Sequence, residues 1–121
     1  MSSVKILHNP RCSKSRQALS LIEQAGITPE VVLYLKEPVG KAFLEQLKHY
    51  LDIKSVRSIM RTKETEYREL GLGSVDDEDI LLDALVTTPK LLERPIVITH
   101  SDSGIRARVG RPPENVLDIL P

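Results

Sequence analysis

The chain has 121 residues, of which 17 are basic, 17 are acidic and 40% are hydrophobic. This length fits one globular domain, so we expect a single domain over residues 1–121. Because the formal net charge is zero, nothing indicates a global attraction to nucleic acid or to an anionic membrane. Trp is absent and Phe43 is the only phenylalanine, so the core must be mainly aliphatic.

The first ten residues contain no apolar run long enough for a signal peptide, so we expect no export signal there. No stretch approaches the roughly 20 apolar residues of a membrane span. Cys12 is the only cysteine, which excludes an intramolecular disulfide. We therefore expect a cytoplasmic protein that does not associate with membranes.

The first part of the chain predicts a strand, a helix and a second strand. Residues 4–8 have strand character. Apolar residues recur at helical spacing over residues 18–25, and Gly26 follows where a helix C-terminal glycine belongs. Residues 31–35 are almost continuously apolar, which favours a strand covered on both faces. This order predicts parallel pairing of the two strands with a right-handed crossover.

The middle of the chain is more polar and predicts helices. An amphipathic helix is expected over residues 43–51 and a short helix over residues 55–61. Asp76 and Asp77 are candidate N-caps for a third helix. We interpret the region from about residue 40 to residue 92 as a helical insertion.

The last part predicts a hairpin and a helix. Residues 96–99 and 105–109 have strand character, with Gly104 near the turn between them. Pro112 and Pro113 open a final helix, since proline is tolerated in the first helical turn. The whole order predicts an α/β fold, a mixed sheet flanked by helices and interrupted by the helical insertion.

The single cysteine lies in the sequence HNPRCSKSR, at the expected junction between the first strand and the first helix. The first N–H groups of a helix lack internal partners, and the helix dipole favours negative charge there. Both effects lower the pKa of a thiol. Positive charge nearby comes from Arg11, Lys14 and Arg16. The alternative interpretation is that Cys12 is a buried, inert residue.

Hydroxyl and imidazole groups surround this cysteine in the sequence. Ser13 and Ser15 offer hydrogen bonds to a sulfur anion or to a bound oxyanion, and His8 is expected to act in the titration of the sulfur. We therefore predict a nucleophilic Cys12 at neutral pH. A C-x-x-C redox pair is excluded because position 15 is Ser, and a phosphatase loop because Arg16 is only four residues after Cys12.

Three further arginines lie at the ends of predicted elements: Arg61, Arg94 and Arg111. Guanidinium groups bind tetrahedral oxyanions through paired hydrogen bonds. Any one of them alone is typical of a solvated surface charge, and their spacing does not show that they converge. Pro95 follows Arg94 at the first position of a predicted strand, where no N–H is needed for the ladder.

Five separated motifs carry a family resemblance: HNPRCSKSR, VVLYL, RSIMR…EY.ELGL, ERPIVIT and GRPPENVLDIL. In this order they resemble the glutaredoxin-coupled arsenate reductases, most closely the shorter arsenate-reductase-like branch of that family. The resemblance extends from about residue 4 to residue 120. It implies a thioredoxin-like fold with a helical insertion, and the thioredoxin-like fold implies a cis peptide bond before Pro95.

The resemblance also implies roles for individual residues. Cys12 corresponds to the nucleophile, His8 to a histidine that tunes the thiolate, and Ser15 to a nearby hydroxyl. Pro95 is expected to be structural beside the site. The substrate-binding candidates share a guanidinium group: Arg16, Arg61, Arg94 and Arg111.

The activity implied by the resemblance is reduction of arsenate to arsenite through a Cys12 adduct, with glutathione as external thiol cosubstrate and glutaredoxin as final reductant. Neither a metal nor a bound cofactor is expected, because His8, His49 and His100 lack ligand spacing. Two alternatives stay open: a thiol oxidoreductase acting on another oxyanion or on a mixed disulfide, and a non-catalytic regulator that binds RNA polymerase. Regulators of that kind typically carry the C-x-x-C pair that this chain lacks.

Overall fold

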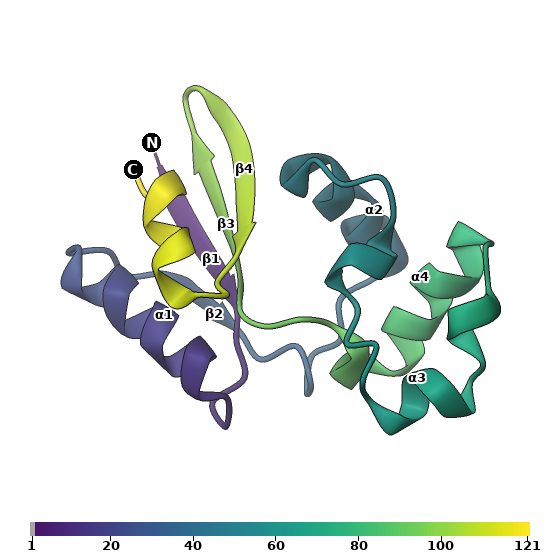
Figure 1. Ribbon diagram of the computed structural model, residues 1–121. Helices are drawn as coiled ribbons and strands as arrows, with labels where there is room; N and C mark the ends of the chain where they lie inside the picture. Colours follow the sequence, from purple (N-terminus) through teal and green to yellow (C-terminus); the bar gives the residue numbers. More distant parts are fainter. Residues whose placement is uncertain (1) are drawn as a thin grey trace. The chain divides into compact units, whose positions relative to one another are not determined.

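The computed structural model describes residues 2–121, which divide into two compact units (Figure 1). The first unit joins the N-terminal part of the chain, through Glu37, to Arg94–Pro121, and the second unit is Pro38–Glu93. The second unit is thus inserted in the sequence of the first, at the place where the helical insertion was expected. That residues 1–121 form a single domain stays a prediction.

Four strands of the first unit form one mixed sheet in the order β2-β1-β3-β4 (Figure 1). In chain order the strands are β1 (Ser3–Leu7), β2 (Glu30–Val32), β3 (Ile96–Ser101) and β4 (Gly104–Val109). β1 pairs parallel with β2, where Ile6 lies opposite Val31, and antiparallel with β3, where Ile6 lies opposite Val97. β3 and β4 form an antiparallel hairpin. The mixed sheet, its parallel first pair and its closing hairpin are confirmed.

One face of the sheet is covered by α1 (Ser13–Gln24) and by the last segment of the chain. The buried core on this face draws on the sheet, on α1 and on that segment: Val4, Ile6, Ala18, Ile22, Val97, Val116 and Ile119. α1 ends as predicted, because Gly26 adopts φ +82°, a left-handed conformation that glycine reaches without steric cost.

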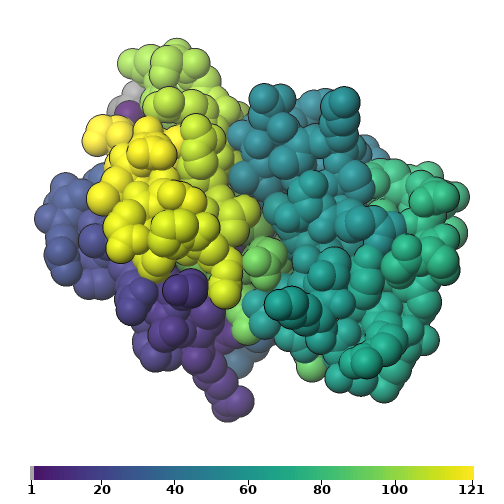
Figure 2. Space-filling view, viewed as in Figure 1, coloured from purple at the N-terminus to yellow at the C-terminus, as the bar shows by residue number. Residues whose placement is uncertain are grey.

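The last segment is η4 (Pro113–Ile119), a 3₁₀ helix where an α-helix was expected. It packs against α1 and β4, and Figure 2 shows its yellow atoms directly beside purple atoms of the N-terminal part. Pro113, Val116 and Ile119 are its buried residues. Because a 3₁₀ helix has three residues per turn, this spacing places all three on one face. The apolar pattern therefore fits the tighter helix better than an α-helix.

The strand expected over residues 31–35 is shorter than predicted. β2 ends at Val32, and the N–H groups of Lys36 and Glu37 both donate to the carbonyl of Leu33 in a turn. Val31 is 42% and Leu35 is 45% exposed, so the expectation of a strand covered on both faces is wrong. β2 is an edge strand, which explains why its apolar residues are not enclosed.

The second unit consists of short helices around an aliphatic core. In chain order these are α2 (Lys41–Leu51), η1 (Val56–Ile59), α3 (Thr65–Glu69), η2 (Leu72–Ser74), α4 (Glu78–Thr87) and η3 (Pro89–Leu91). The short helix expected over residues 55–61 is the 3₁₀ helix η1. Asp77 is the N-cap of α4, as predicted, and its side chain accepts a hydrogen bond from the N–H of Asp79 at 2.9 Å. Every helix within residues 2–121 is too short or too polar to traverse a bilayer.

Glu78, the first residue of α4, ties this helix to two other elements. Its carboxylate accepts hydrogen bonds from the Ser55 hydroxyl at 2.7 Å and the Val56 N–H at 2.8 Å, and it pairs with Lys48 at 3.0 Å. Partial burial by itself raises the pKa of Glu78. The Val56 N–H, the Ser55 hydroxyl and Lys48 together lower it by more than burial raises it, so the net shift is downward. The ionised carboxylate therefore stabilises the fold.

Candidate active site

Cys12 occupies the N-cap position of α1, with extended backbone at φ −93° and ψ 122°. Its N–H donates to the Asn9 carbonyl at 3.0 Å, and its carbonyl accepts the N–H of Arg16 at 3.0 Å. The side chain is partly buried and makes no conventional capping hydrogen bond. The sulfur thus lies where the helix presents N–H groups without internal partners.

The pKa of the Cys12 thiol is lowered. Burial by itself raises it, but the N–H of Ser15, the Arg94 side chain and the N–H of Lys14, together with the positive charge of Arg94, outweigh burial. These groups favour the thiolate, the form that acts as nucleophile. The inferred effect of the helix N-terminus is present, and the cation that acts on the sulfur is Arg94, which the sequence alone does not place beside it.

His8 and Ser15 are buried together at the start of α1. His8 directly follows β1 and is 6% exposed, and Ser15 is fully buried. The His8 Nδ1 lies 2.6 Å from the Ser15 Oγ, which also accepts the N–H of Asn9 at 3.1 Å. Burial and then the charge of Arg16 lower the pKa of His8, so its imidazole is neutral at pH 7. The structure therefore shows His8 as a hydrogen-bonded, neutral imidazole, and its role in tuning the thiolate stays a prediction.

The loop between β1 and Cys12 is held by two side chains. The Asn9 Oδ1 accepts the N–H of Arg11 at 3.0 Å, and the Arg16 Nη1 donates to the Pro10 carbonyl at 2.9 Å. Asn9 was missed among the candidate residues, although Asn commonly hydrogen-bonds the backbone two residues on and so favours a turn. Arg16, a predicted substrate-binding residue, has one guanidinium nitrogen engaged by the loop itself.

Arg94 and Arg111 lie together at the start of β3. The peptide bond between Arg94 and Pro95 is cis, as the resemblance implied, and the Arg111 Nη1 donates to the Arg94 carbonyl at 3.2 Å. The Nε of Arg94 is buried and has no hydrogen-bond partner among residues 2–121. A buried donor without a partner is costly, so this nitrogen is suited to receive an anion. The structure thus brings Arg94 to Cys12 and Arg111 to Arg94.

Gly110 supports this corner and was missed by sequence reasoning. Its N–H donates to the Pro95 carbonyl at 2.9 Å. A Cβ at position 110 would lie 2.7 Å from the Pro95 Cγ and 3.2 Å from the Val116 Cγ1, so only glycine fits without movement. The signal in the sequence was a glycine between the predicted last strand and Pro112.

Arg61 belongs to the second unit, just after Met60. Its Nε donates to Glu64 at 3.0 Å and its Nη1 donates to Glu93 at 3.2 Å. Its N–H donates to the Leu91 carbonyl at 2.7 Å. Two carboxylates therefore hold this guanidinium, and its oxyanion-binding role stays a prediction.

Within residues 2–121, no three His, Cys, Asp or Glu side chains gather in a way that suits a metal ion. The chemistry displayed by the described residues is that of a thiolate and a guanidinium. The expectation that no metal or cofactor is bound stays a prediction.

The mixed sheet, the helix that follows β1 and the cis-proline before β3 define a thioredoxin-like architecture, with a partly buried thiol at the start of that helix. The ArsC family matches residues 7–119, and the chain belongs to this family. It is 48% identical over 121 residues to an arsenate reductase of Neisseria meningitidis, covering 99% of this chain and 100% of that protein.

Two further relatives agree with this assignment. The chain is 50% identical over 118 residues to the uncharacterized protein YfgD of Escherichia coli, covering 97% of this chain and 96% of that protein. A solved arsenate reductase from Vibrio cholerae is 47% identical with a TM-score of 0.90, covering 98% of each chain. The family resemblance and the thioredoxin-like fold with its insertion are therefore confirmed.

Proposed function

We propose that this protein reduces arsenate to arsenite through the Cys12 thiolate. The observation that carries the proposal is the Cys12 sulfur, whose pKa is lowered by the N-terminus of α1 and by Arg94. The buried Arg94 Nε without a partner supports an oxyanion beside this sulfur. The arsenate reductase names of the Neisseria and Vibrio relatives support arsenate as that oxyanion.

The first step is attack of the thiolate on arsenic. Arg94 holds the arsenate, and Arg111 fixes the Arg94 backbone through its hydrogen bond to the Arg94 carbonyl. An As–S bond forms, and an arsenic-bound hydroxyl takes up one proton and leaves as water. Catalysis rests on positioning and on electrostatic stabilisation of the charged arsenate. His8 and Ser15 keep the loop that carries Cys12 in place.

External thiols complete the reaction, because Cys12 is the only cysteine in the chain. Glutathione replaces a second hydroxyl on arsenic, which again leaves as water. The thiolate of glutaredoxin then attacks the glutathione sulfur, forming a mixed disulfide and leaving the electron pair on arsenic, which becomes As(III). Water replaces Cys12 on the arsenic, so arsenite is released and the thiol is regenerated.

The test is a coupled assay of the purified protein with arsenate, glutathione and glutaredoxin, with arsenite as the measured product. Cys12→Ser should abolish turnover while the fold is retained. Arg94→Ala should lower kcat/KM. The corresponding loss of transition-state stabilisation is about 1–3 kcal/mol, the contribution of a hydrogen bond to a charged group. The matched control is Arg106→Ala, an exposed arginine on β4, which should leave kcat/KM unchanged.

Two results would overturn the proposal. Full turnover in Cys12→Ser would remove the sulfur from the mechanism. A wild-type protein that reduces a glutathione mixed disulfide but not arsenate would favour the alternative thiol oxidoreductase.

A further inference from the structure

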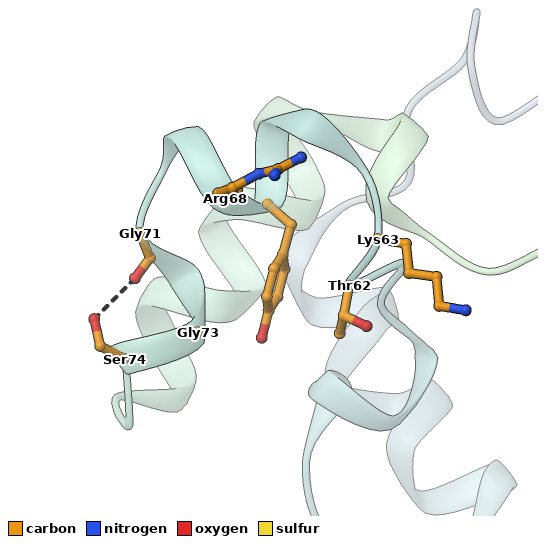
Figure 3. A pocket seen from close by; sticks show the side chains of 7 residues that line it. Thr62, Lys63, Arg68, Gly71, Gly73 and Ser74 are labelled. Atoms are coloured by element: carbon orange, nitrogen blue, oxygen red, sulfur yellow. Dashed lines mark hydrogen bonds between the residues drawn. The ribbon is translucent and has the colours of Figure 1, made fainter.

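The second unit contains a pocket of about 580 Å³ that no part of the proposed reaction uses (Figure 3). It lies around α3 and η2, and its lining includes Lys63, Tyr67, Arg68, Gly71 and Gly73. The volume is within the range of small-molecule sites and far above the roughly 30 Å³ occupied by one water. None of its lining residues is acidic.

Two cations of this pocket have no ion-pair partner among residues 2–121. Lys63 and Arg68 are both exposed, and Figure 3 shows Arg68 on α3 and Lys63 in the chain that leads to it. Two glutamates of the same segment are engaged by other cations: Glu64 pairs with Arg61, and Glu66 pairs with Lys90 at 2.9 Å. A third, Glu69, is exposed and does not line the pocket. The lining of the pocket therefore carries two positive charges and no negative charge.

The aromatic wall of the pocket is the Tyr67 ring, and Arg57 holds this ring in place. Its Nη1 donates to the Tyr67 hydroxyl and, at 3.0 Å, to the Leu72 carbonyl, and its Nη2 donates to the Val75 carbonyl. The guanidinium carbon lies 6.0 Å from the centroid of the Tyr67 ring. Three acceptors from α3, η2 and the chain that follows are thus held by one side chain. A wall arranged in advance lowers the entropic cost of binding.

Glycines keep the ring edge open. A Cβ at Gly73 would lie 3.7 Å from the Tyr67 Cε1, so the absence of a side chain leaves that side of the ring uncovered. Gly71 adopts φ +65°, which returns the chain from α3 toward η2. The pocket therefore combines an apolar aromatic surface with two cations that have no ion-pair partner in the described part of the chain.

We propose that this pocket binds a small organic anion that carries a carboxylate beside an apolar body. Arg68 receives the carboxylate, since charge-assisted hydrogen bonds of this kind are strong and directional for a guanidinium. Lys63 adds a second positive charge to the lining. The Tyr67 ring and the glycine backbone contact the apolar body. This inference is independent of arsenate reduction, because none of its residues belongs to the Cys12 site.

The experiment is an NMR titration of the ¹⁵N-labelled protein, followed through the amide resonances of Gly71 and Gly73. The probes are benzoate, reduced glutathione and inorganic phosphate. We expect saturable shifts with benzoate, whereas reduced glutathione, which has carboxylates but no apolar body, should bind more weakly. The double variant Lys63→Gln/Arg68→Gln should weaken the binding of benzoate by about tenfold, because it removes both positive charges of the lining.

The control double variant is Lys54→Gln/Arg106→Gln, which removes the same charge from exposed positions outside the pocket and should leave the affinity unchanged. Gly73→Ala keeps the charge and fills space beside the ring, so it should also weaken binding and serves if the first variant does not fold. Absence of saturable shifts with benzoate would overturn the inference. Binding of glutathione or phosphate as tight as that of benzoate, or an equal loss of affinity in the control variant, would do the same. Arsenate turnover is not the readout, so failure here leaves the proposed function standing.

Discussion

Replacing Arg94 by glutamine tests how the Cys12 thiolate is stabilised. The variant removes the cation whose hydrogen bond and charge lower the pKa of Cys12, and it keeps a polar side chain. A hydrogen bond to a charged group contributes about 1.5–3 kcal/mol, which we reduce to about 1 kcal/mol because the sulfur is partly solvated. A free energy of about 1 kcal/mol changes the thiolate-to-thiol ratio by about fivefold.

The assay is the rate of Cys12 alkylation by iodoacetamide as a function of pH. Only the thiolate reacts, so the midpoint of the profile reports the pKa of Cys12. In Arg94→Gln the midpoint should move to higher pH, and the rate on the acidic side should fall about fivefold. The N–H groups of Ser15 and Lys14 still act on the sulfur in this variant, so only the contribution of Arg94 to the lowered pKa should be lost.

The control for this experiment is Arg106→Gln, which lowers the net charge equally from an exposed position on β4. Its midpoint should match that of the wild type. An unchanged midpoint in Arg94→Gln, or an equal shift in the control, would refute the argument that Arg94 stabilises the thiolate by direct contact.

Three further predictions concern stability. Ser15→Ala leaves the buried His8 ring nitrogen without its partner, so the free energy of unfolding in urea should fall by about 1–3 kcal/mol. Glu78 has a lowered pKa in the folded state, so its stabilisation is present above its ordinary pKa and is lost as the pH falls through the lowered value. Urea midpoints at neutral and acidic pH should show this loss, and Glu78→Gln should diminish it. Gly110→Ala forces a methyl group against Pro95 and should destabilise the protein by about 1–3 kcal/mol in the same urea assay.

Matched variants separate these effects from general sensitivity to substitution. Ser13→Ala, at an exposed position of α1, should change stability by less than about 0.5 kcal/mol. Gly40→Ala places its methyl group in open space and should cost less than Gly110→Ala. Equal losses in variant and control would show that the hydroxyl of Ser15 or the close contact of Gly110 has no special role.

Much of the first unit follows from local patterns in the sequence. The helix after Cys12 was predictable because its apolar spacing and its terminal glycine agree, and its start placed the sulfur at a helix N-terminus. The hairpin was predictable because a turn signal at Gly104 separates the apolar run at residues 96–99 from the strand residues Ile105 and Val109. Periodicity failed where burial depends on neighbours: residues 31–35 are as apolar as an enclosed strand, yet β2 lies at the sheet edge.

Contacts between residues distant in sequence were beyond prediction from spacing. The sequence around Arg94 does not show that its side chain reaches Cys12. The two residues come close because Cys12 follows β1, Arg94 precedes β3, and these two strands pair. The pairing of Arg61 with Glu64 and Glu93 likewise depends on how the second unit folds. The segment around Tyr67 mixes both charge signs, a pattern typical of a solvated surface, and this pattern does not show that Arg57 holds the Tyr67 ring.

The position of Cys12 at the N-terminus of α1 has a consequence for the NMR spectrum of the protein. The N–H groups of Lys14 and Ser15 act on the ionised sulfur, so alkylation or bonding to arsenic removes the charge on the sulfur that they stabilise. Their amide resonances should therefore differ between the free and each covalently modified protein. The backbone of this first turn therefore reports, through its amide resonances, what is attached to the sulfur.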